Sequence, residues 1–297
     1  MIAVVGGYGM GLTMTVPRFP AAGETVSGGR LSTGHGGKGS NQAVAIRRLG
    51  QPSALFTAIG SDAAGTAALG FWAEEDVDAS AVVRSAAATM TGFILVDPSG
   101  ENRITIADGA LGALTADDVD GFAATIALAS MLVLSLEVPI PVARRATSVA
   151  RSAGVSVLLN PAPANGDAEL AALADILSPN QSELCQLVGA PDAGVEECLD
   201  KLRAWYPGRV VVTCGAAGAV VDDGSTRERV PAVPVDAVVD TTGAGDAFTA
   251  GLAVALVEGA TLVEAARFAA AVGAHVVTIS EVIPALPFRD DVERIRA

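Results

Sequence analysis

The sequence MLVLSLEVPIPVARRATSVARSAGVSVLLN, residues 131–160, contains a predicted strand, a helix and a second strand in succession. Met131–Leu136 and Val155–Leu159 are short apolar runs, typical of strands that are buried on both faces. Val142–Ala153 lies between them and has the composition and length of an ordinary helix. A strand–helix–strand unit of this kind connects neighbouring parallel strands.

The same alternation continues on both sides of this unit. Apolar runs bounded by turn residues predict further strands at 2–5, 53–59, 176–177, 210–213 and 219–221. Segments rich in Ala and Leu predict further helices at 41–49, 63–75, 168–173, 247–258 and 262–277. We therefore expect an α/β fold, a three-layer α/β/α sandwich with a mostly parallel central sheet.

Two segments interrupt the alternation. Residues 12–35 and 89–107 carry Gly, Pro and Asn around short β-like pieces, and neither holds a helical pattern. Asp97-Pro98-Ser99-Gly100 has the residue types of a hairpin turn. We predict that the two segments form a small β-sheet lid. The predicted core then consists of residues 1–11, 36–88 and 108–297.

The composition excludes several classes of protein. The net charge at pH 7 is −14, so we expect neither nucleic acid nor an anionic membrane as a partner. The most apolar stretch, 122–136, falls short of the ~20 apolar residues that cross a bilayer. The N-terminus lacks signal-peptide features and the three cysteines lack metal-ligand spacing, so we expect a cytoplasmic protein with reduced thiols.

The motif Asp240-Thr241-Thr242-Gly243-Ala244-Gly245-Asp246 lies directly before a predicted helix. A glycine-rich turn at a helix N-terminus directs unpaired N–H groups to one point, so Gly243, Ala244 and Gly245 are expected to form an anion hole. Asp246 beside that hole fits a general base that accepts a proton from an attacking hydroxyl. The alternative is an ordinary helix cap, because Gly and Asp commonly begin helices.

A second glycine-rich motif, Gly34-His35-Gly36-Gly37-Lys38-Gly39-Ser40-Asn41, opens the first predicted helix. It lacks the spacing of a Walker loop. Its glycines would let the backbone approach a ligand closely, with Lys38 and Asn41 as charge and hydrogen-bond contacts. Taken alone, the motif favours the alternative of a flexible hinge between the lid and the core.

Ligands of open α/β sheets bind outside the carboxyl ends of the strands. Polar or glycine residues follow four predicted strands at that position: Glu137, Asn160, Asn180, and Gly215 with Gly218. Glu183 lies three residues after Asn180, a spacing that suits either a hydrated metal ion or a helix capping box. The capping box is the favoured interpretation.

The glycines in Gly6-Gly7-Tyr8-Gly9-Met10-Gly11 do not fit the dinucleotide pattern G-x-G-x-x-G, and no helix opens behind them. A dinucleotide-dependent oxidoreductase is therefore not expected. His35 and His275 lack partners at metal or triad spacing.

Together these segments resemble the ribokinase-like (PfkB) carbohydrate kinase family along nearly the whole chain. The two glycine motifs, in this order and separation, carry most of the resemblance. Further similar segments are Phe19-Pro20, Gly23–Val26, Leu136-Glu137, 160–164 and 179–183. The resemblance implies a sheet between helices, a β lid and a homodimer formed through it. It also implies transfer of the γ-phosphoryl group of ATP to a sugar hydroxyl, with Mg²⁺ and K⁺ as cations.

Matching positions imply roles for individual residues. Asp246 corresponds to the catalytic base, and residues 243–245 correspond to the anion hole. The positions of sugar contacts are Gly37, Lys38, Asn41, Glu137 and Asp246. The positions of nucleotide contacts are Asn180, Thr213, Gly215, Gly218, Gly243 and Gly245. Asn180 and Glu183 match the Mg²⁺-associated pair, and Asp240 with the Thr242 carbonyl matches part of a K⁺ site.

Two departures from the family pattern bear on the substrate and the cation. Gly9 and Gly11 stand where ribose-phosphorylating members carry an Asn-x-Asp pair. Each lost hydrogen bond is worth ~1–3 kcal/mol, and the space suits a bulkier or less hydroxylated substrate. Residues 278–283 replace the small, glycine-containing turn that helps complete the K⁺ site, which argues against potassium activation.

The favoured function is an ATP-dependent kinase of a ribose-like pentose or a related carbohydrate, with Asp246 as general base. One alternative is a nucleoside kinase of the same family. Another is a sugar-binding or regulatory protein without catalysis, against which the intact Asp246 and its glycine turn argue.

Overall fold

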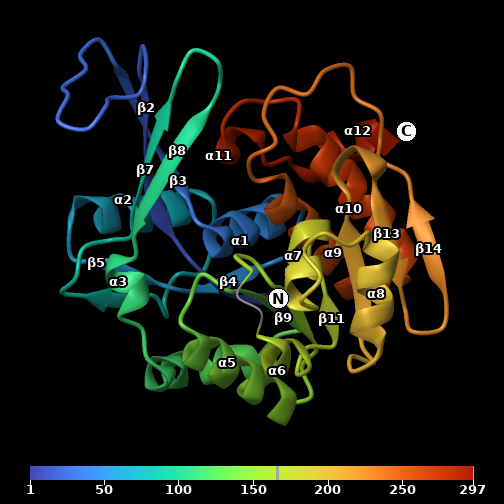
Figure 1. Cartoon of the computed structure of the whole chain (residues 1–297). Coiled ribbons are helices and arrows are strands. Elements are labelled where there is room, and N and C mark those ends of the chain that lie inside the picture. The colour runs from blue at the N-terminus through green and yellow to red at the C-terminus, as the bar shows by residue number, and fades with distance from the viewer. Residues whose placement is uncertain (165–166, 297) are drawn as a thin grey trace.

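The computed structural model describes residues 1–164 and 167–296, and an eight-stranded sheet forms its centre (Figure 1). Asn165, Gly166 and Ala297 of the predicted core lie outside the described residues. The strand order is β14-β13-β12-β11-β10-β9-β1-β4. Neighbours from β12 to β4 are parallel, and β13 runs antiparallel to β12 and β14. The strands are β1 (Ile2–Val5), β4 (Ser53–Phe56), β9 (Met131–Ser135), β10 (Val157–Asn160), β11 (Ile176–Leu177), β12 (Arg209–Thr213), β13 (Ala219–Asp222) and β14 (Arg227–Val230).

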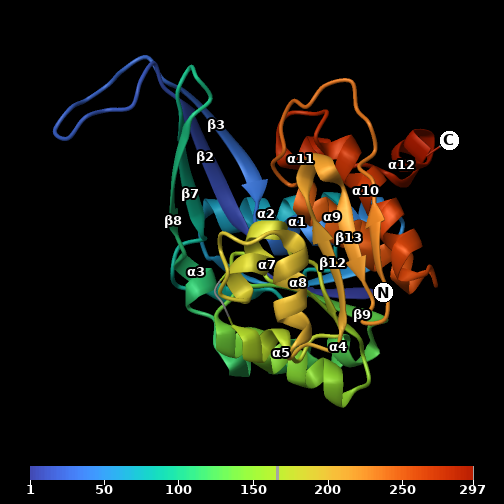
Figure 2. The ribbon, with the colours of Figure 1, turned by 45° about the vertical axis from the view of Figure 1, so that its right-hand side comes forward.

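Helices cover both faces of this sheet, so the predicted three-layer sandwich is confirmed (Figure 2). Side chains of β1 alternate between two buried clusters, with Ile2 and Val4 in one and Ala3 and Val5 in the other. The first cluster packs against α1 (Lys38–Arg48), α2 (Ala63–Glu74), α9 (Ala244–Val257), α10 (Leu262–Val276), α11 (Val282–Ala285) and α12 (Arg289–Arg296). The second packs against α3 (Gly109–Gly112), η1 (Ala116–Phe122), α4 (Ala123–Leu128), α5 (Ile140–Ser152), α6 (Ala168–Ala171), α7 (Gln181–Leu187) and α8 (Val195–Arg203).

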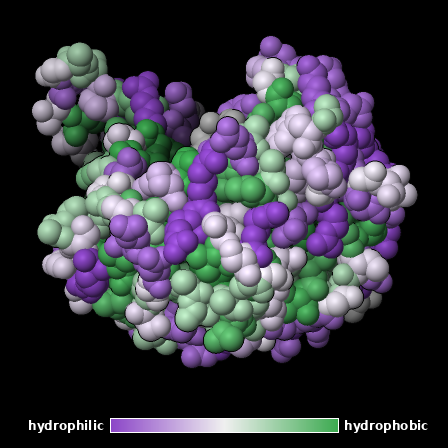
Figure 3. Space-filling view, turned by 90° about the horizontal axis from the view of Figure 1, so that it is seen from below, coloured by the Kyte–Doolittle hydropathy of each residue, from purple (hydrophilic) through white to green (hydrophobic). Residues whose placement is uncertain are grey.

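A separate four-stranded sheet, the lid sheet, stands away from the core and projects beyond it when seen from below (Figures 1 and 3). Its order is β3-β2-β7-β8, with β2 (Gly9–Thr15), β3 (Arg30–Gly36), β7 (Thr91–Val96) and β8 (Asn102–Ala107). The hairpin turn predicted at 97–100 joins β7 to β8, and the Gly100 N–H donates to the Asp97 carbonyl at 3.0 Å. The exact boundaries between core and lid stay a prediction.

Several elements differ from the sequence expectations. The strand predicted over 53–59 divides at Thr57, because β5 (Ala58–Gly60) leaves the central sheet to pair with β6 (Val83–Ser85). For α7, only the capping box of Asn180 and Glu183 was recognised, and neither α8 nor β14 was predicted. No helix in the described ranges is long and apolar enough to cross a membrane.

The expectation of reduced thiols is wrong for two of the three cysteines. Helices α7 and α8 pack together and bring the Cα atoms of Cys185 and Cys198 to 5.4 Å, where the two form a disulfide. Cys214 remains a free thiol. Two cysteines 13 residues apart match no known pairing motif, so the disulfide could be recognised only from the packing of the two helices.

Candidate active site

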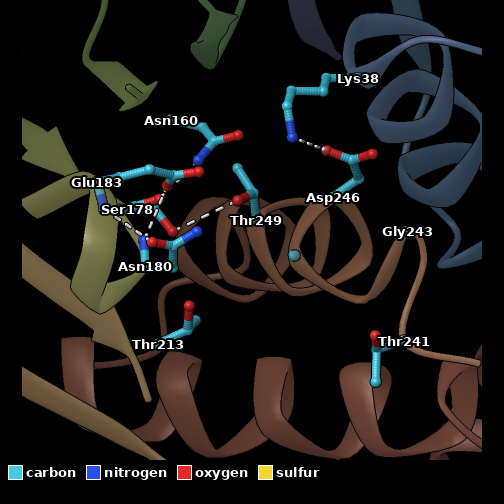
Figure 4. A pocket seen from close by; sticks show the side chains of 11 residues that line it. Lys38, Asn160, Ser178, Asn180, Glu183, Thr213, Thr241, Gly243, Asp246 and Thr249 are labelled. Carbon is cyan, nitrogen blue, oxygen red and sulfur yellow. Dashed lines mark hydrogen bonds and ion pairs between the residues drawn. The ribbon is translucent and has the colours of Figure 1, made fainter. Parts of the chain in front are cut away.

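A polar cavity of about 200 Å³ opens at the carboxyl ends of the central strands. Figure 4 shows Lys38 pointing at Asp246 on one side of it, while Asn160, Ser178, Asn180 and Glu183 gather on the other. The lining residues are Lys38, Asn160, Ser178, Asn180, Glu183, Thr213, Thr241, Gly243, Gly245, Asp246 and Thr249.

The start of α1 brings Lys38 to the cavity through a close approach of two glycine-rich segments. Gly37, the residue before the helix, has φ 93°, and a Cβ there would lie 2.6 Å from the Gly7 carbonyl oxygen. Glu137 stabilises the contact between the two segments, because its Oε2 accepts hydrogen bonds from the N–H of Lys38 at 2.6 Å and from the N–H of Gly7 at 3.2 Å. The glycines of the segments 6–11 and 34–39 therefore permit a close backbone contact that side chains would block.

Asp246 lies in the first turn of α9 and is only 5% exposed. Its Oδ2 accepts from Asn41 Nδ2 at 2.8 Å, and its Oδ1 lies 3.9 Å from Lys38 Nζ. Burial raises the pKa of the Asp246 carboxyl, while Lys38 and the side-chain donors oppose that rise. The side chain thus combines the proton affinity of a base with an ordered set of donors.

Three charged groups surround Asp246. Burial raises the pKa of Glu137 to about 7, and the charge of Asp246 adds to that effect. Burial also raises the pKa of Glu183. Burial alone would lower the pKa of Lys38, but the carboxylates of Asp246, Glu137 and Glu183 outweigh it and raise the value, so the ammonium stays charged.

The turn before α9 has the geometry expected of an anion-binding helix start. Gly243 adopts a left-handed conformation with φ 81°, and its Cβ would lie 2.7 Å from Val282 Cγ1. The Ala244 N–H donates to the Thr241 carbonyl at 3.3 Å and is therefore engaged within the turn. In the part of the chain that the structure describes, no protein acceptor bonds the N–H groups of Gly243 and Gly245. These amides are available to a ligand anion.

On the opposite wall, Asn180 and Glu183 form the capping box of α7. Asn180 Oδ1 accepts from the Glu183 N–H at 2.8 Å, and Glu183 Oε2 accepts from the Asn180 N–H at 2.9 Å. Both residues also line the cavity, so the cap and the site use the same pair. Thr213, at the end of β12, forms an isolated β-bridge with Asn180 and adds its side chain to the same wall.

The structure places the predicted residues at different distances from the cavity. Eight line it: Lys38, Asn160, Asn180, Glu183, Thr213, Gly243, Gly245 and Asp246. Three others are not among the lining residues but adjoin them: Gly37 directly precedes Lys38, Glu137 accepts from the Lys38 N–H, and Asn41 donates to Asp246. Gly215 and Gly218 bracket a short 3₁₀ turn after β12 and are not among the lining residues, nor are Asp240, Thr242 and Ala244.

The sequence reasoning missed Ser178, Thr241 and Thr249 as lining residues. Ser178 follows β11 and could have been found by the rule that already selected Asn160 and Asn180. Thr249 lies one helical turn beyond Asp246 and faces the same side. Thr241 belongs to the quoted glycine motif but carried no separate signal.

Comparison with known proteins identifies the family. The model of the pfkB family carbohydrate kinases matches residues 1–289. A ribokinase of Haemophilus influenzae is 35% identical, covering 98% of this chain and 96% of its own. The structure of an Arabidopsis thaliana ribokinase complexed with ribose and ATP superposes with a TM-score of 0.90 at 29% identity, covering 99% and 97% of the two chains.

A nucleoside kinase of Methanocaldococcus jannaschii also superposes, with a TM-score of 0.80 over 99% and 97% of the two chains. Its identity is 22%, which shows the shared fold alone. The relatives thus fit a sugar kinase better than the nucleoside alternative. The chain belongs to the pfkB family of carbohydrate kinases and is a phosphotransferase that acts on a sugar hydroxyl.

Proposed function

We propose that the protein transfers the γ-phosphoryl group of ATP to a hydroxyl of a pentose-like sugar, with Asp246 as general base. The observation that carries this proposal is the position of Asp246. A buried carboxylate lies beside the free amides of a helix N-terminus and opposite a lysine ammonium. A base and an anion site so close together suit an attack by a hydroxyl on a phosphoryl group.

The proposed step balances in atoms and charge. The sugar hydroxyl gives its proton to the Asp246 carboxylate, its oxygen forms a bond to the γ-phosphorus, and the bond from that phosphorus to the bridging oxygen breaks, releasing ADP. The N–H groups of Gly243 and Gly245, together with the dipole of α9, hold the negative charge of the transferred group. Lys38 adds a positive charge next to the base.

Mg²⁺ would accompany the nucleotide at the wall formed by Asn180 and Glu183. The capping box uses only Oε2 of Glu183, so the other oxygen of this carboxylate is available to an ion or its water ligands. In the described ranges, no three or more His, Cys, Asp or Glu side chains are arranged so that they could hold a metal ion by themselves, which fits an ion held chiefly by phosphates and water. When bound, the ion neutralises phosphate charge. Thr213 and the turn between Gly215 and Gly218 complete the proposed nucleotide side.

An ADP-release assay with Mg·ATP and a panel of sugars and nucleosides tests this function. Release with a pentose or another sugar supports the proposal. Release with nucleosides alone favours the nucleoside kinase. No release with any acceptor, from folded protein that binds ATP, favours the inactive sugar-binding protein.

The substrate side differs at Gly9 and Gly11. A Cβ on Gly9 would lie 2.5 Å from Met90 Cε and 3.0 Å from the Met90 carbonyl oxygen, so the buried methionine fills the space at this position. A Cβ on Gly11 would meet nothing closer than the Gly34 carbonyl at 3.6 Å. The room expected at both glycines is therefore present only at Gly11. We infer that the preferred substrate presents fewer hydroxyls to β2 than ribose does.

Restoring a carboxylate at the open position should improve ribose as a substrate. We expect Gly11→Asp to raise kcat/KM for ribose about tenfold, because a hydrogen bond to a charged group contributes about 1.5–3 kcal/mol. Gly9→Asn is the contrasting variant and should give no gain, since it must displace Met90. Steady-state kinetics with ribose and less hydroxylated sugars measures both. If ribose is already the best substrate of the unaltered protein, the inference from these glycines is wrong.

We expect potassium to have little effect. Asp240 Oδ1 accepts from the Thr242 N–H at 2.9 Å and Oγ1 at 2.6 Å, and Oδ2 accepts from the Glu281 N–H at 3.2 Å. Both oxygens of the proposed cation ligand thus already have protein donors. Replacing choline chloride by KCl at fixed ionic strength should leave the rate unchanged, because screening is held constant. A large rise would mean that a potassium site survives.

A homodimer formed through the lid sheet and a cytoplasmic location are parts of the same proposal. Met14, Leu31 and Phe93 are exposed on the lid sheet, as are Ile104 and Ile106 of its edge strand β8. Exposed apolar side chains next to an open strand edge favour association with another chain. The molar mass in solution, measured by light scattering, tests the dimer.

A further inference from the structure

Helix α1 directs three side chains at the proposed base. Lys38, Asn41 and Gln42 are spaced i, i+3 and i+4, so they lie on one face of the helix. The amide nitrogen of Gln42 lies 3.4 Å from Asp246 Oδ1 and also 3.4 Å from Asn160 Oδ1. Each of its two N–H groups thus has its own acceptor.

The second acceptor is fixed to the sheet. Asn160 is the last residue of β10, is 6% exposed, and donates from Nδ2 to the Ser178 carbonyl at 2.8 Å. Ser178 Oγ in turn lies 3.4 Å from Thr249 Oγ1 on α9, the helix that carries Asp246. A chain of polar contacts therefore runs from the base through Gln42 to the sheet and back to α9.

Gln42 occupies an unfavourable place for a polar residue. Its side chain is completely buried, and its Oε1 has no hydrogen-bond partner in the described part of the chain. An unpaired buried carbonyl destabilises the folded protein, so packing alone would favour an apolar side chain of similar volume. The benefit that offsets this cost is the pair of donors that the amide presents to Asp246 and Asn160.

We propose that Gln42 is a positioning residue that orients the Asp246 carboxylate. Asn41 fixes Oδ2 with the shorter bond, and Gln42 holds Oδ1 with the longer one. The plane of the carboxylate is thereby set, with Oδ1 held between the Gln42 amide and the Lys38 ammonium at 3.9 Å. The inference rests on the proposed role of Asp246 as general base.

The charged groups and hydrogen-bond donors around Asp246 determine how loss of Gln42 changes the pH dependence of activity. Lys38 faces it from α1, Glu137 from the loop after β9, and Glu183 from α7. The hydrogen bonds from Asn41 and Gln42 stabilise the ionised form and lower the pKa of Asp246 against the effect of burial. Loss of the Gln42 donors should therefore raise that pKa, and activity that requires the ionised base should begin at higher pH.

The test is Gln42→Met, which preserves volume and removes both donors. We expect kcat to fall about tenfold to a hundredfold, as for a misplaced catalytic group, with KM for ATP unchanged. The acid limb of the kcat–pH profile should move to higher pH. Ser53→Ala is the matched control, because the buried Ser53 hydroxyl also bonds α1, at the Ala43 carbonyl, but does not contact Asp246. This control should leave the profile in place.

An unchanged acid limb in Gln42→Met, with a loss of kcat no greater than in the control, would overturn the proposal. If Gln42→Met does not fold, Gln42→Asn replaces it: the shorter amide can no longer reach both acceptors, and the limb should again move upward. The two levels of inference are separable. Full turnover in Asp246→Asn would refute the base itself, whereas an inactive Asp246→Asn together with a normal profile in the Gln42 variants would refute only the positioning role.

Discussion

Asp246→Asn is expected to reduce kcat by a factor of about 10² to 10⁴, the range that general base catalysis contributes. Asparagine has the same shape and can still accept a hydrogen bond from Asn41, so the anion hole and the cavity walls should persist. It cannot take the proton of the attacking hydroxyl. Binding of ATP, followed by calorimetry, should stay close to that of the unaltered protein while turnover is lost.

A second buried carboxylate provides the control. Asp222 is 4% exposed and pairs with Arg203 and Arg227 at a distance from the cavity. Asp222→Asn should lower the melting temperature, because it removes the charge that compensates two guanidinium groups. It should leave kcat of the folded protein unchanged. Equal turnover in Asp246→Asn and Asp222→Asn would refute the proposed role of Asp246 as general base.

Gly37→Ala is expected to impair both stability and catalysis. At φ 93° and ψ 132° an L side chain is strained by about 1–3 kcal/mol. Its Cβ would also lie 2.6 Å from the Gly7 carbonyl oxygen and from Tyr8 Cα, and both are backbone atoms that cannot rotate away. The peptide must therefore shift, which breaks the bonds by which Lys38 and Gly7 hold Glu137. A shift of this size should lower kcat/KM about a hundredfold.

Thermal unfolding and steady-state kinetics measure the two effects together. Gly70→Ala is the matched substitution, because Gly70 lies within α2 and a Cβ there meets nothing within 4 Å. Alanine at an open helical position should keep full activity and raise stability slightly, by up to about 1 kcal/mol. If Gly37→Ala behaves like Gly70→Ala, the close approach between the two glycine segments has no functional importance.

The predicted elements were most accurate where one local pattern sufficed. The strand Ile2–Val5 and the helix at 63–75 agree with β1 and α2 to within a residue, because continuous apolar runs and stretches rich in Ala and Leu are local signals. α7 spans only seven residues, and the four buried apolar residues of α8, at 195, 198, 199 and 202, have a helical spacing that was not recognised. The fold of those helices depends on their packing against the second core cluster.

For the site, the glycine motifs and strand-end residues could be found from the sequence because they require a local backbone conformation. The sequence could not show that the side chains of these segments meet in one site. Asn41 and Asp246 are 205 residues apart, yet their side chains meet at 2.8 Å. The sequence reasoning assigned no role to Gln42, whose two acceptors belong to distant elements. Met90 fills the space at Gly9, a contact that no spacing in the sequence indicates.

The amino-acid sequence by itself determined the α/β class, the family resemblance and the positions of the two glycine-rich turns before helices, because periodicity, caps and positive φ angles are properties of neighbouring residues. Tertiary structure alone decided which carboxylate is buried beside a lysine, which glycine leaves open space, and which cysteines pair. The physical reason is that burial, pKa shifts and steric exclusion arise from atoms brought together by the fold, and these atoms lie on segments far apart in the chain.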